Sequence, residues 1–478
     1  SEGKAAISTG GDGSVTIELD GDNTAKSGNN HAGVEKNNRG NLTITDADGD
    51  GTLEAAGDNG GAGIGGGILG DGSDITISGN AKVEASGGSF AAGIGGGNNG
   101  SGRNITIGGN AEVIATGGIY GAGIGGGPTS DGRNITIDGN AEVIATGGEY
   151  GAGIGGGNGS DGNVTISGNA KIENATGGYG AAGIGGGAFS SPDKIGNGNV
   201  VIKDNAKIDN VQGDAYGAGI GGGIYGLSNV TIEGNTKVNA TGGAGGAAIG
   251  GGAGAENNSD NNGNQITIKS NENGSPTINA VGGGTDEGEK IVIGGAGIGA
   301  GCESNADADI TLEGKVTITA TAGKDNVAIG ANGIEQEFSG LAEGSSITRY
   351  DPEGNDITLP TDPVPAVPSS SGGSSADASV QESVFPGLVV TDKDGQRISY
   401  TSTQSGNTLT VCVGRFTASF RISLAALRQL RAEGIETITF QTVLCSTTLS
   451  VDELLAMGGE DAEAVLTHRF TDSSLTVG

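Results

Sequence analysis

The chain has 478 residues and is dominated by glycine, with 102 glycines against 8 phenylalanines, 7 tyrosines and no tryptophan. So few bulky side chains cannot fill one large compact core, whereas a repeat protein needs only a few small apolar residues in each repeat. A formal net charge of −32 argues against nucleic acid and anionic membrane surfaces as partners. Three cysteines are too few for a disulfide scaffold.

The glycine-rich segment GAGIGGG, first found at Gly61–Gly67, recurs along the chain with a dominant period of 30 residues. A fixed period of this length indicates a solenoid in which each repeat forms one coil. The isoleucine at the centre of the segment falls at nine positions: Ile64, Ile94, Ile124, Ile154, Ile184, Ile220, Ile249, Ile298 and Ile329.

A single repeat, residues 104–130, contains three short strand patterns. Residues Asn104–Ile107 and Ala111–Thr116 alternate apolar and polar side chains, Ala122–Ile124 form a third apolar segment, and glycines separate the three. A propeller blade would need four strands and about 40–50 residues. The pattern therefore predicts an all-β parallel β-helix of about ten coils, with three sheets and a core of small aliphatic side chains.

Two polar rows follow the same period. An asparagine lies three residues after the first strand of the coil, where its tolerance of left-handed backbone suits a tight turn and where stacked amides can hydrogen bond along the solenoid. A row of threonines points outward from the first strand, as is ordinary in strands. We interpret both rows as structural. The asparagines are Asn80, Asn110, Asn140, Asn169, Asn205, Asn235 and Asn271.

A row of aromatic residues precedes the glycine-rich segment in five consecutive repeats. Its rings could form a platform on which sugars stack, or a ladder that stacks on itself. Strand parity with the inward isoleucines favours internal rings, but only this row supplies rings at regular spacing. We therefore take it as the candidate glycan-binding site. The row consists of Phe90, Tyr120, Tyr150, Tyr179 and Tyr216.

The best metal candidate is the segment Asp46–Glu54, which reads DADGDGTLE. Aspartates at alternate positions before a glycine are typical of the opening of a calcium loop. The twelfth position, where such a loop carries a bidentate glutamate, is Gly57, and Asp58 could replace it. The sequence thus predicts a candidate calcium site, with a solvated acidic turn as the alternative. Its ligands would be Asp46, Asp48, Asp50 and Asp58.

The repeat stops after Tyr350, so we assign residues 1–350 to the β-helix. Several prolines and then the segment SSSGGSS predict a linker over residues 351–378. Residues 379–478 have an ordinary composition with both strand and helix patterns, which predicts a small α+β domain. In that domain, Cys412 and Cys445 could pair or remain free thiols.

A catalytic constellation is missing from the sequence. It contains no nucleophile elbow, HExxH motif, P-loop or zinc-type cysteine spacing. The two histidines, His31 and His468, fall in different predicted domains. We therefore expect that the protein is not an enzyme.

Residues 10–335 resemble a group of bacterial surface proteins known as carbohydrate-binding domain-containing proteins, which build right-handed parallel β-helices from ITI-x-GN and GAGIGGG repeats. The opening VTIELDG, Val15–Gly21, and the following HAGVE look like the start of that group. The resemblance implies an extracellular or cell-surface location and glycan binding. Relatives of the fold are associated with calcium and with acidic plant polysaccharides such as pectin.

Taken together, the sequence predicts a non-enzymatic, monomeric protein, secreted or on the bacterial cell surface, that binds a polysaccharide or a host or plant glycan as an adhesin does. We expect no membrane insertion because no apolar run is typical of a signal peptide or a transmembrane span. The chain is interpreted as a mature fragment. Two alternatives are a passive structural stalk that presents other domains and a β-helix polysaccharide lyase.

Overall fold

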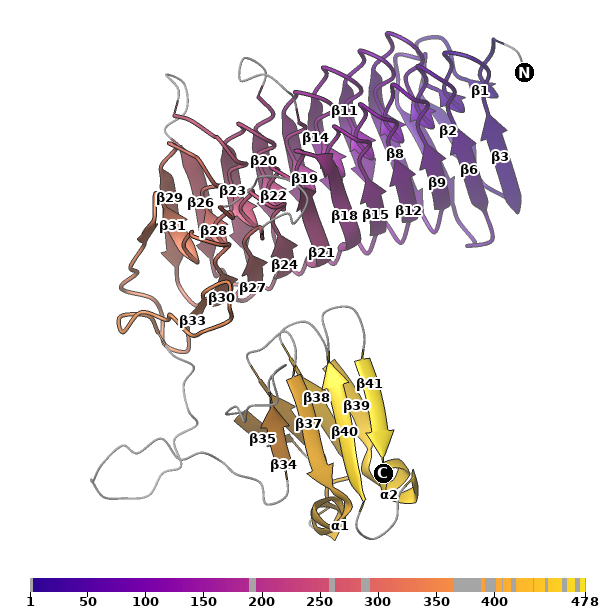
Figure 1. Ribbon diagram of the computed structural model, residues 1–478. Helices are drawn as coiled ribbons and strands as arrows, with labels where there is room; N and C mark the ends of the chain where they lie inside the picture. The colour runs from indigo at the N-terminus through magenta and orange to yellow at the C-terminus, as the bar shows by residue number, and fades with distance from the viewer. Residues whose placement is uncertain are drawn as a thin grey trace. The chain divides into compact units, whose positions relative to one another are not determined.

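The computed structural model describes residues 3–188, 195–257, 263–284 and 293–363, and then 388–391, 401–405, 407–413, 418–432, 434–442, 446–457, 462–468 and 473–477. The chain divides into two compact units, Ser1–Pro368 and Ser369–Gly478. The first unit is a solenoid and the second a small domain of two sheets and two helices (Figure 1).

The solenoid consists of three sheets, to each of which a complete coil contributes one strand. Sheet A holds the glycine-rich segments: β1 (Ile7–Ser8), β4 (Val34–Glu35), β7 (Ile64–Gly65), β10 (Ile94–Gly95), β13 (Ile124–Gly125), β16 (Ile154–Gly155), β19 (Ile184–Gly185), β22 (Ile220–Gly221), β25 (Ile249–Gly250), β28 (Ile298–Gly299), β31 (Ile329–Ala331) and β32 (Ile334–Glu335). Sheet B holds β2 (Val15–Glu18), β5 (Leu42–Asp46), β8 (Gly72–Gly79), β11 (Gly102–Ile107), β14 (Gly132–Ile137), β17 (Gly162–Ile166), β20 (Gly198–Ile202), β23 (Ser228–Glu233), β26 (Asn264–Lys269) and β29 (Ala308–Glu313). Sheet C holds β3 (Asp22–Lys26), β6 (Thr52–Ala56), β9 (Lys82–Ser86), β12 (Glu112–Thr116), β15 (Glu142–Thr146), β18 (Lys171–Tyr179), β21 (Lys207–Asp214), β24 (Lys237–Thr241), β27 (Thr277–Val281), β30 (Thr317–Thr321) and β33 (Ser346–Tyr350).

The predicted parallel β-helix is confirmed, because identical positions of successive repeats pair in parallel. Ile94 pairs with Ile64 on one side and with Ile124 on the other. Ten strands in sheet B define ten complete coils, and sheets A and C each continue past them. The core is made of small aliphatic side chains from all three sheets, mostly isoleucines of sheets A and B and valines and alanines of sheet C, whereas Ile7 and Ile334 in the end strands of sheet A are exposed.

The glycine that follows each sheet A isoleucine is required by the close approach of neighbouring coils. Gly125 has a φ of 138°, where side chains are rarely accommodated. A Cβ atom there would lie only 2.0 Å from the carbonyl oxygen of Gly155 in the next coil. From β7 to β31 the backbones therefore stack without a side chain at this position, which explains the Ile-Gly pair in the motif, whereas the first two coils carry Ser8 and Glu35 here.

The asparagine row forms a hydrogen-bonded ladder, as the structural interpretation expects. The Asn110 amide donates to Asn80 Oδ1 at 2.9 Å and the Asn140 amide to Asn110 Oδ1 at 2.9 Å, and the ladder continues through Asn169, Asn205 and Asn235. The left-handed backbone belongs to the preceding residue instead, such as Gly109 with a φ of 68°. The asparagine thus serves the turn through its side chain and not through its backbone.

The second unit contains two four-stranded sheets and two helices, in agreement with the predicted α+β domain. One sheet is β34 (Leu388–Thr391), β37 (Ala418–Ser423), β40 (Glu463–His468) and β41 (Ser473–Val477), and the other is β35 (Thr401–Ser405), β36 (Thr408–Cys412), β38 (Thr437–Gln441) and β39 (Ser446–Ser450). The helices are α1 (Leu424–Ala432) and α2 (Val451–Met457). Within the described residues, no helix has the length and apolar character needed to cross a membrane.

The proposed pairing of Cys412 and Cys445 lies outside the described residues, since Cys445 and the side chain of Cys412 are not among them. Cys302, in the solenoid, is a buried free thiol, and loss of solvent raises its pKa to about 11. A thiol with so high a pKa is a poor nucleophile at neutral pH. Cys302 therefore belongs to the packing of its coil.

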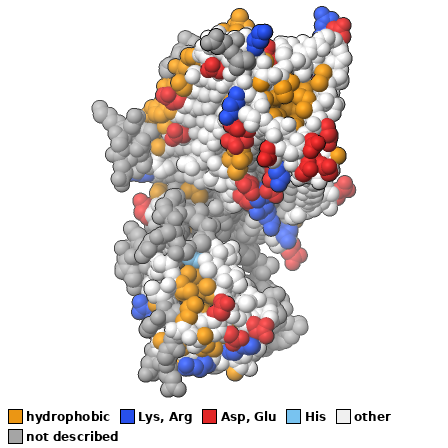
Figure 2. All heavy atoms as spheres, turned by 90° about the vertical axis from the view of Figure 1, so that its right-hand side faces the viewer, with side chains coloured by type: hydrophobic (Ala, Val, Ile, Leu, Met, Phe, Trp, Pro, Cys, Tyr) orange, Lys and Arg blue, Asp and Glu red, His pale blue; other side chains and the backbone are white. Residues whose placement is uncertain are grey.

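On the surface, acidic side chains gather in clusters with basic ones between them on the face drawn in Figure 2. Many of the basic groups are paired. Lys82 lies 3.4 Å from Glu112, and Lys171 lies within 4 Å of Glu142, Glu173 and Asp209 on sheet C. These exposed pairs contribute little stability individually. Pairing does not change the net charge, so the chain remains strongly negative.

Candidate functional site

The aromatic row lies on the surface of the solenoid and not inside it. Tyr120 and Tyr150 stand in the turn before sheet A, so the strand parity that favoured internal rings does not apply to them. Both are half-buried, while Phe90 is 36% and Tyr179 is 40% exposed. The rings are therefore accessible, as a binding row requires.

The orientation of the rings limits what this row can bind. Phe90, Tyr120 and Tyr150 stack nearly parallel, with centroids 5.7 and 5.5 Å apart and interplanar angles of 11° and 12°. Tyr179 then lies edge-on to Tyr150 at 76° and to Tyr216 at 80°. A sugar stacks on the face of a ring, but both faces of Tyr120 are covered by its neighbours. Phe90 has one stacked neighbour, so the row offers few free ring faces.

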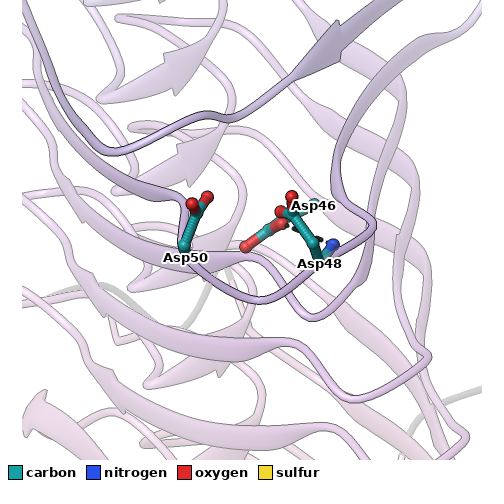
Figure 3. A group of neighbouring side chains, drawn as sticks. All are labelled: Asp46, Asp48 and Asp50. Atoms are coloured by element: carbon teal, nitrogen blue, oxygen red, sulfur yellow. Dashed lines mark hydrogen bonds between the residues drawn. The ribbon is translucent and has the colours of Figure 1, made fainter.

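Three of the four predicted calcium ligands come together. The side-chain oxygens of Asp46, Asp48 and Asp50 lie within 4.8 Å of one another at the turn from sheet B to sheet C (Figure 3). Asp46 is buried and its carboxylate organises the turn, since Oδ1 accepts the N–H of Gly49 at 2.9 Å and Oδ2 accepts that of Gly51 at 2.8 Å. The hydrogen bond from Gly49 is the main reason why the pKa of Asp46 is lowered.

The fourth predicted ligand, Asp58, does not belong to this group, so that part of the prediction is corrected. Asp58 follows β6, whose five residues carry the chain away from the acidic turn to the opposite corner of the coil. The remaining three carboxylates suit a hard cation in chemistry, but Ca²⁺ takes six to eight oxygen ligands. Water would have to complete the coordination of an ion held by Asp46, Asp48 and Asp50.

A polar groove of about 1210 Å³ runs along the solenoid where each coil enters sheet B. It is lined by the first residues of β14, β17, β20, β23, β26 and β29, so it follows the axis over six consecutive coils. A line of residues in register, including Gly162 and Gly198, separates two rows of polar side chains. At Gly198 a Cβ atom would lie 2.0 Å from the carbonyl oxygen of Gly221, so a side chain is not accommodated there. In the following coils the line continues with Ser228, Asn264 and Ala308.

One wall of the groove, which we call the turn row, contains Asp131, Asp161 and Asn197. Its side chains hydrogen bond to the backbone of the solenoid. Asp131 Oδ1 accepts the N–H of Asp161 at 3.1 Å, Asp161 Oδ1 accepts that of Asn197 at 2.8 Å, and Asn197 Oδ1 accepts that of Leu227 at 3.0 Å. Each side chain thus fixes the backbone of the next coil. Loss of solvent around its carboxylate, and then the nearby charge of Asp131, raise the pKa of Asp161.

The opposite wall, the free amide row, consists of Asn163, Asn199, Asn229 and Gln265, which pair with one another in register. Asn199 and Asn229 are exposed, and Asn163 and Gln265 are half-buried. None of the four side chains hydrogen bonds to another residue in the described part of the chain. Unlike the amides of the Asn80–Asn235 ladder, these donors and acceptors are available to a ligand.

The ends of the groove differ in charge. Arg133, at one end, is neutralised by Asp131, whose Oδ2 accepts a hydrogen bond from Arg133 Nε at 2.9 Å. Asp307 and Asp309 flank the other end, and Asp309 continues the register of Gln265. Neither carboxylate forms an ion pair with any residue that the structure describes. The groove is therefore amide-lined in the middle and acidic at one end.

The groove was not among the sites predicted from the sequence, although the sequence contains a signal for it. The segments Asp131–Asn134 and Asp161–Asn163 place polar residues on both sides of a glycine, immediately before the strand of sheet B. In a strand the residues on either side of an inward position point outward together. Two outward polar positions repeated in successive coils would have predicted two rows along the axis.

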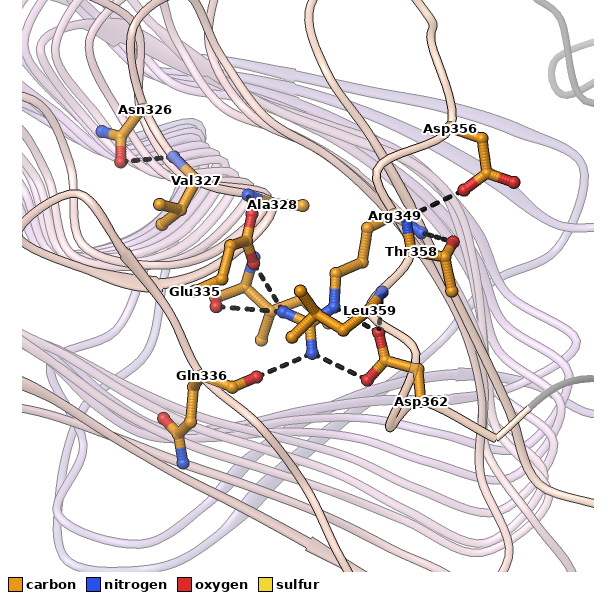
Figure 4. A network of polar contacts seen from close by, with 11 residues as sticks. Asn326, Val327, Ala328, Glu335, Gln336, Arg349, Asp356, Thr358, Leu359 and Asp362 are labelled. Carbon is orange, nitrogen blue, oxygen red and sulfur yellow. Dashed lines mark hydrogen bonds and ion pairs between the residues drawn. The ribbon is translucent and has the colours of Figure 1, made fainter.

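Sequence analysis also missed the polar network that closes the solenoid at its C-terminal end. Arg349 is fully buried in β33, and its guanidinium donates to Asp362 in a bidentate pair at 2.7 and 2.9 Å (Figure 4). It also donates to Glu335 and to the carbonyl oxygen of Gln336. Residues 351–363, predicted as the start of a linker, are thus packed on the last coil by the buried Asp362.

Three segments of the solenoid, residues 75–98, 135–158 and 164–188, match the family model of the beta helix repeat. Each segment begins in a strand of sheet B and runs through sheet C into the glycine-rich segment. Together with the three parallel sheets, the match makes this chain a β-helix protein. No curated protein and no solved structure matches the chain.

Proposed function

We propose that the solenoid is an extracellular or cell-surface protein that binds a polysaccharide without cleaving it, and that the sugar chain lies in the polar groove along the axis. The observation that supports this proposal most directly is the free amide row. The amide groups of this row recur at about 4.8 Å, the spacing of neighbouring strands. An extended chain of sugars carries hydrogen-bonding groups at similar intervals, so the two can pair along the groove. The match to the beta helix repeat supports a surface or carbohydrate-related role.

The groove supports this proposal better than the aromatic row does. The side chains of Asn199 and Asn229 have donors and acceptors that no described residue uses, whereas both faces of Tyr120 are already covered. A glycan site on the row Phe90–Tyr216 stays a prediction, and it could not use the faces of Tyr120. The two sites predict different effects of mutation, so one set of variants separates them.

The two alternative functions find less support. A passive stalk needs no row of unpaired amides on its surface. A polysaccharide lyase needs a cation that stabilises the charge developing on the substrate when the proton is removed, and the only cationic side chain among the described lining residues is Arg133, which is paired with Asp131. We therefore favour a binding protein, which we expect to be a monomer.

The test is a glycan-binding experiment with the double variant Asn199→Ala/Asn229→Ala. Its matched control is Asn205→Ala/Asn235→Ala, which removes two asparagines from the opposite corner of the same two coils. On an array of polysaccharides, the groove variant should lose at least tenfold in affinity while the control binds as the wild type does. Absence of binding by the wild type to all glycans would instead favour the stalk, and shortened sugar chains would favour the lyase.

A further inference from the structure

The charge and hydrogen bonding of the residues that line the groove also indicate which class of sugar it binds. We infer that it takes a linear glycan of uncharged or amino-bearing sugars and rejects uronic acids, so that a chain with free amino groups binds better than its acetylated counterpart. This inference rests on the proposed function, and it departs from the acidic polysaccharides that the family resemblance implies.

Its first support is the charge of the lining. Asp161, Asp307 and Asp309 border the groove, and the one basic residue among its described lining, Arg133, is already neutralised by Asp131. A uronate chain would therefore bring carboxylates beside carboxylates, and the described lining offers no free cation to receive them, which is unfavourable. The formal net charge of −32 adds a long-range repulsion of the same sign.

The second support is that the carboxylates at the acidic end of the groove have no basic partner among the described residues. Asp309 is exposed, follows Gln265 in register, and makes no hydrogen bond or ion pair to another described residue. Among the described residues, Asp307 accepts side-chain hydrogen bonds only from the neutral amides of Asn257 and Asn332, at 3.2 and 3.4 Å. Two carboxylates that have no cationic partner in the described part of the chain, at the end of a row of neutral amides, suit an ammonium group on a sugar.

The middle of the groove suits the uncharged part of such a chain. An amide side chain offers both donors and an acceptor, so it can meet hydroxyl or acetamido groups in either role. Asn163, Asn199, Asn229 and Gln265 supply such groups in consecutive coils. The amide row would thus hold the chain, and the acidic end would favour its amino form.

The experiment measures binding of the full chain to three hexasaccharides by calorimetry at a mildly acidic pH. The ligands are the hexamers of glucosamine, N-acetylglucosamine and galacturonic acid. We expect the glucosamine hexamer to bind most tightly, the acetylated one more weakly, and the uronate not measurably. Added salt should reduce the difference between the first two, because exposed charge pairs are screened.

The variant Asp307→Asn/Asp309→Asn should lose about three- to tenfold of the preference for the amino hexamer, the scale of exposed charge pairs, and keep its affinity for the acetylated hexamer. Its control is Glu84→Gln/Glu112→Gln on sheet C, which changes the net charge equally and should keep the preference. Equal or better binding of the uronate, or an undiminished preference in the groove variant, would overturn the inference and leave the proposed function standing. Failure of all three hexamers to bind would also overturn the inference, whereas the proposed function falls only if no polysaccharide on the array binds.

Discussion

The glycines of sheet A are the residues on which the stacking of coils depends most directly. Replacing Gly125 by alanine would place a Cβ atom 2.0 Å from the Gly155 oxygen at a φ of 138°. Backbone strain alone is expected to cost about 1–3 kcal/mol, and the clash adds to it. Thermal unfolding should show a clear loss for Gly125→Ala. Gly10→Ala, where nothing lies within 4 Å, should stay within about 0.5 kcal/mol of the wild type.

The negative charge of Asp161 destabilises the folded state. Because its pKa is raised in the folded state, the wild type gains stability as the pH falls through the window above the ordinary carboxyl pKa of about 4. Asp161→Asn keeps the acceptor for the Asn197 N–H, as Asn197 itself does for Leu227. The variant should be more stable than the wild type at pH 7, by less than about 1 kcal/mol. Denaturation curves should show the gap closing as the pH is lowered, and a gap that does not change with pH would contradict this assignment.

The acidic turn of Asp46, Asp48 and Asp50 makes a separate prediction about calcium. A hydrogen bond with Asp46 and then the charge of Asp50 raise the pKa of Asp48, so a bound cation would relieve this crowding. Calcium should raise the melting temperature of the wild type, and Asp48→Asn/Asp50→Asn should abolish that increase. Asp58→Asn is the control and should respond as the wild type does. An increase retained in the double variant would place the ion elsewhere.

At the scale of elements, the aromatic row acts as a stacked ladder along the corner between sheets C and A. Tyr120 has two stacked neighbours and Phe90 has one. Since an aromatic pair contributes about 0.5–1.5 kcal/mol, Tyr120→Ala should lower the free energy of unfolding by about 1–3 kcal/mol and Phe90→Ala by less. Chemical denaturation measures both. Lost glycan binding with unchanged stability would instead make the row the binding site.

The coil, the groove and the closing network differ in how far the sequence predicts them. The coil was predictable because the isoleucines and glycines repeat, and the repeat dictates which residues pair, as Ile94 does with Ile64. The groove was harder to predict, because its amides differ from the ladder amides only in having no hydrogen-bond partner among the described residues. The closing network escaped prediction for another reason, since Arg349, Glu335 and Asp362 occur once and obey no period.

At the scale of the whole molecule, the two units have separate hydrophobic cores. The solenoid core runs from Leu19 to Ile347, and the core of the second unit from Leu388 to Leu466. The solenoid core is continuous through its coils, so neighbouring coils support one another, as in other repeat proteins. Each core should therefore unfold cooperatively by itself, and calorimetry of the full chain should resolve two transitions.

A pair of variants tests this independence. Arg349→Met leaves Asp362 and Glu335 without their buried partner, and breaking such a pair costs about 3–5 kcal/mol. Leu427→Ala removes a fully buried side chain from α1, which costs about 2–5 kcal/mol. The first variant should lower only the solenoid transition and the second only the other, while exposed Arg103→Met should move neither. If either buried variant shifted both transitions equally, the two units would be unfolding as one, because only energetic coupling between their cores transmits a local loss of stability to both.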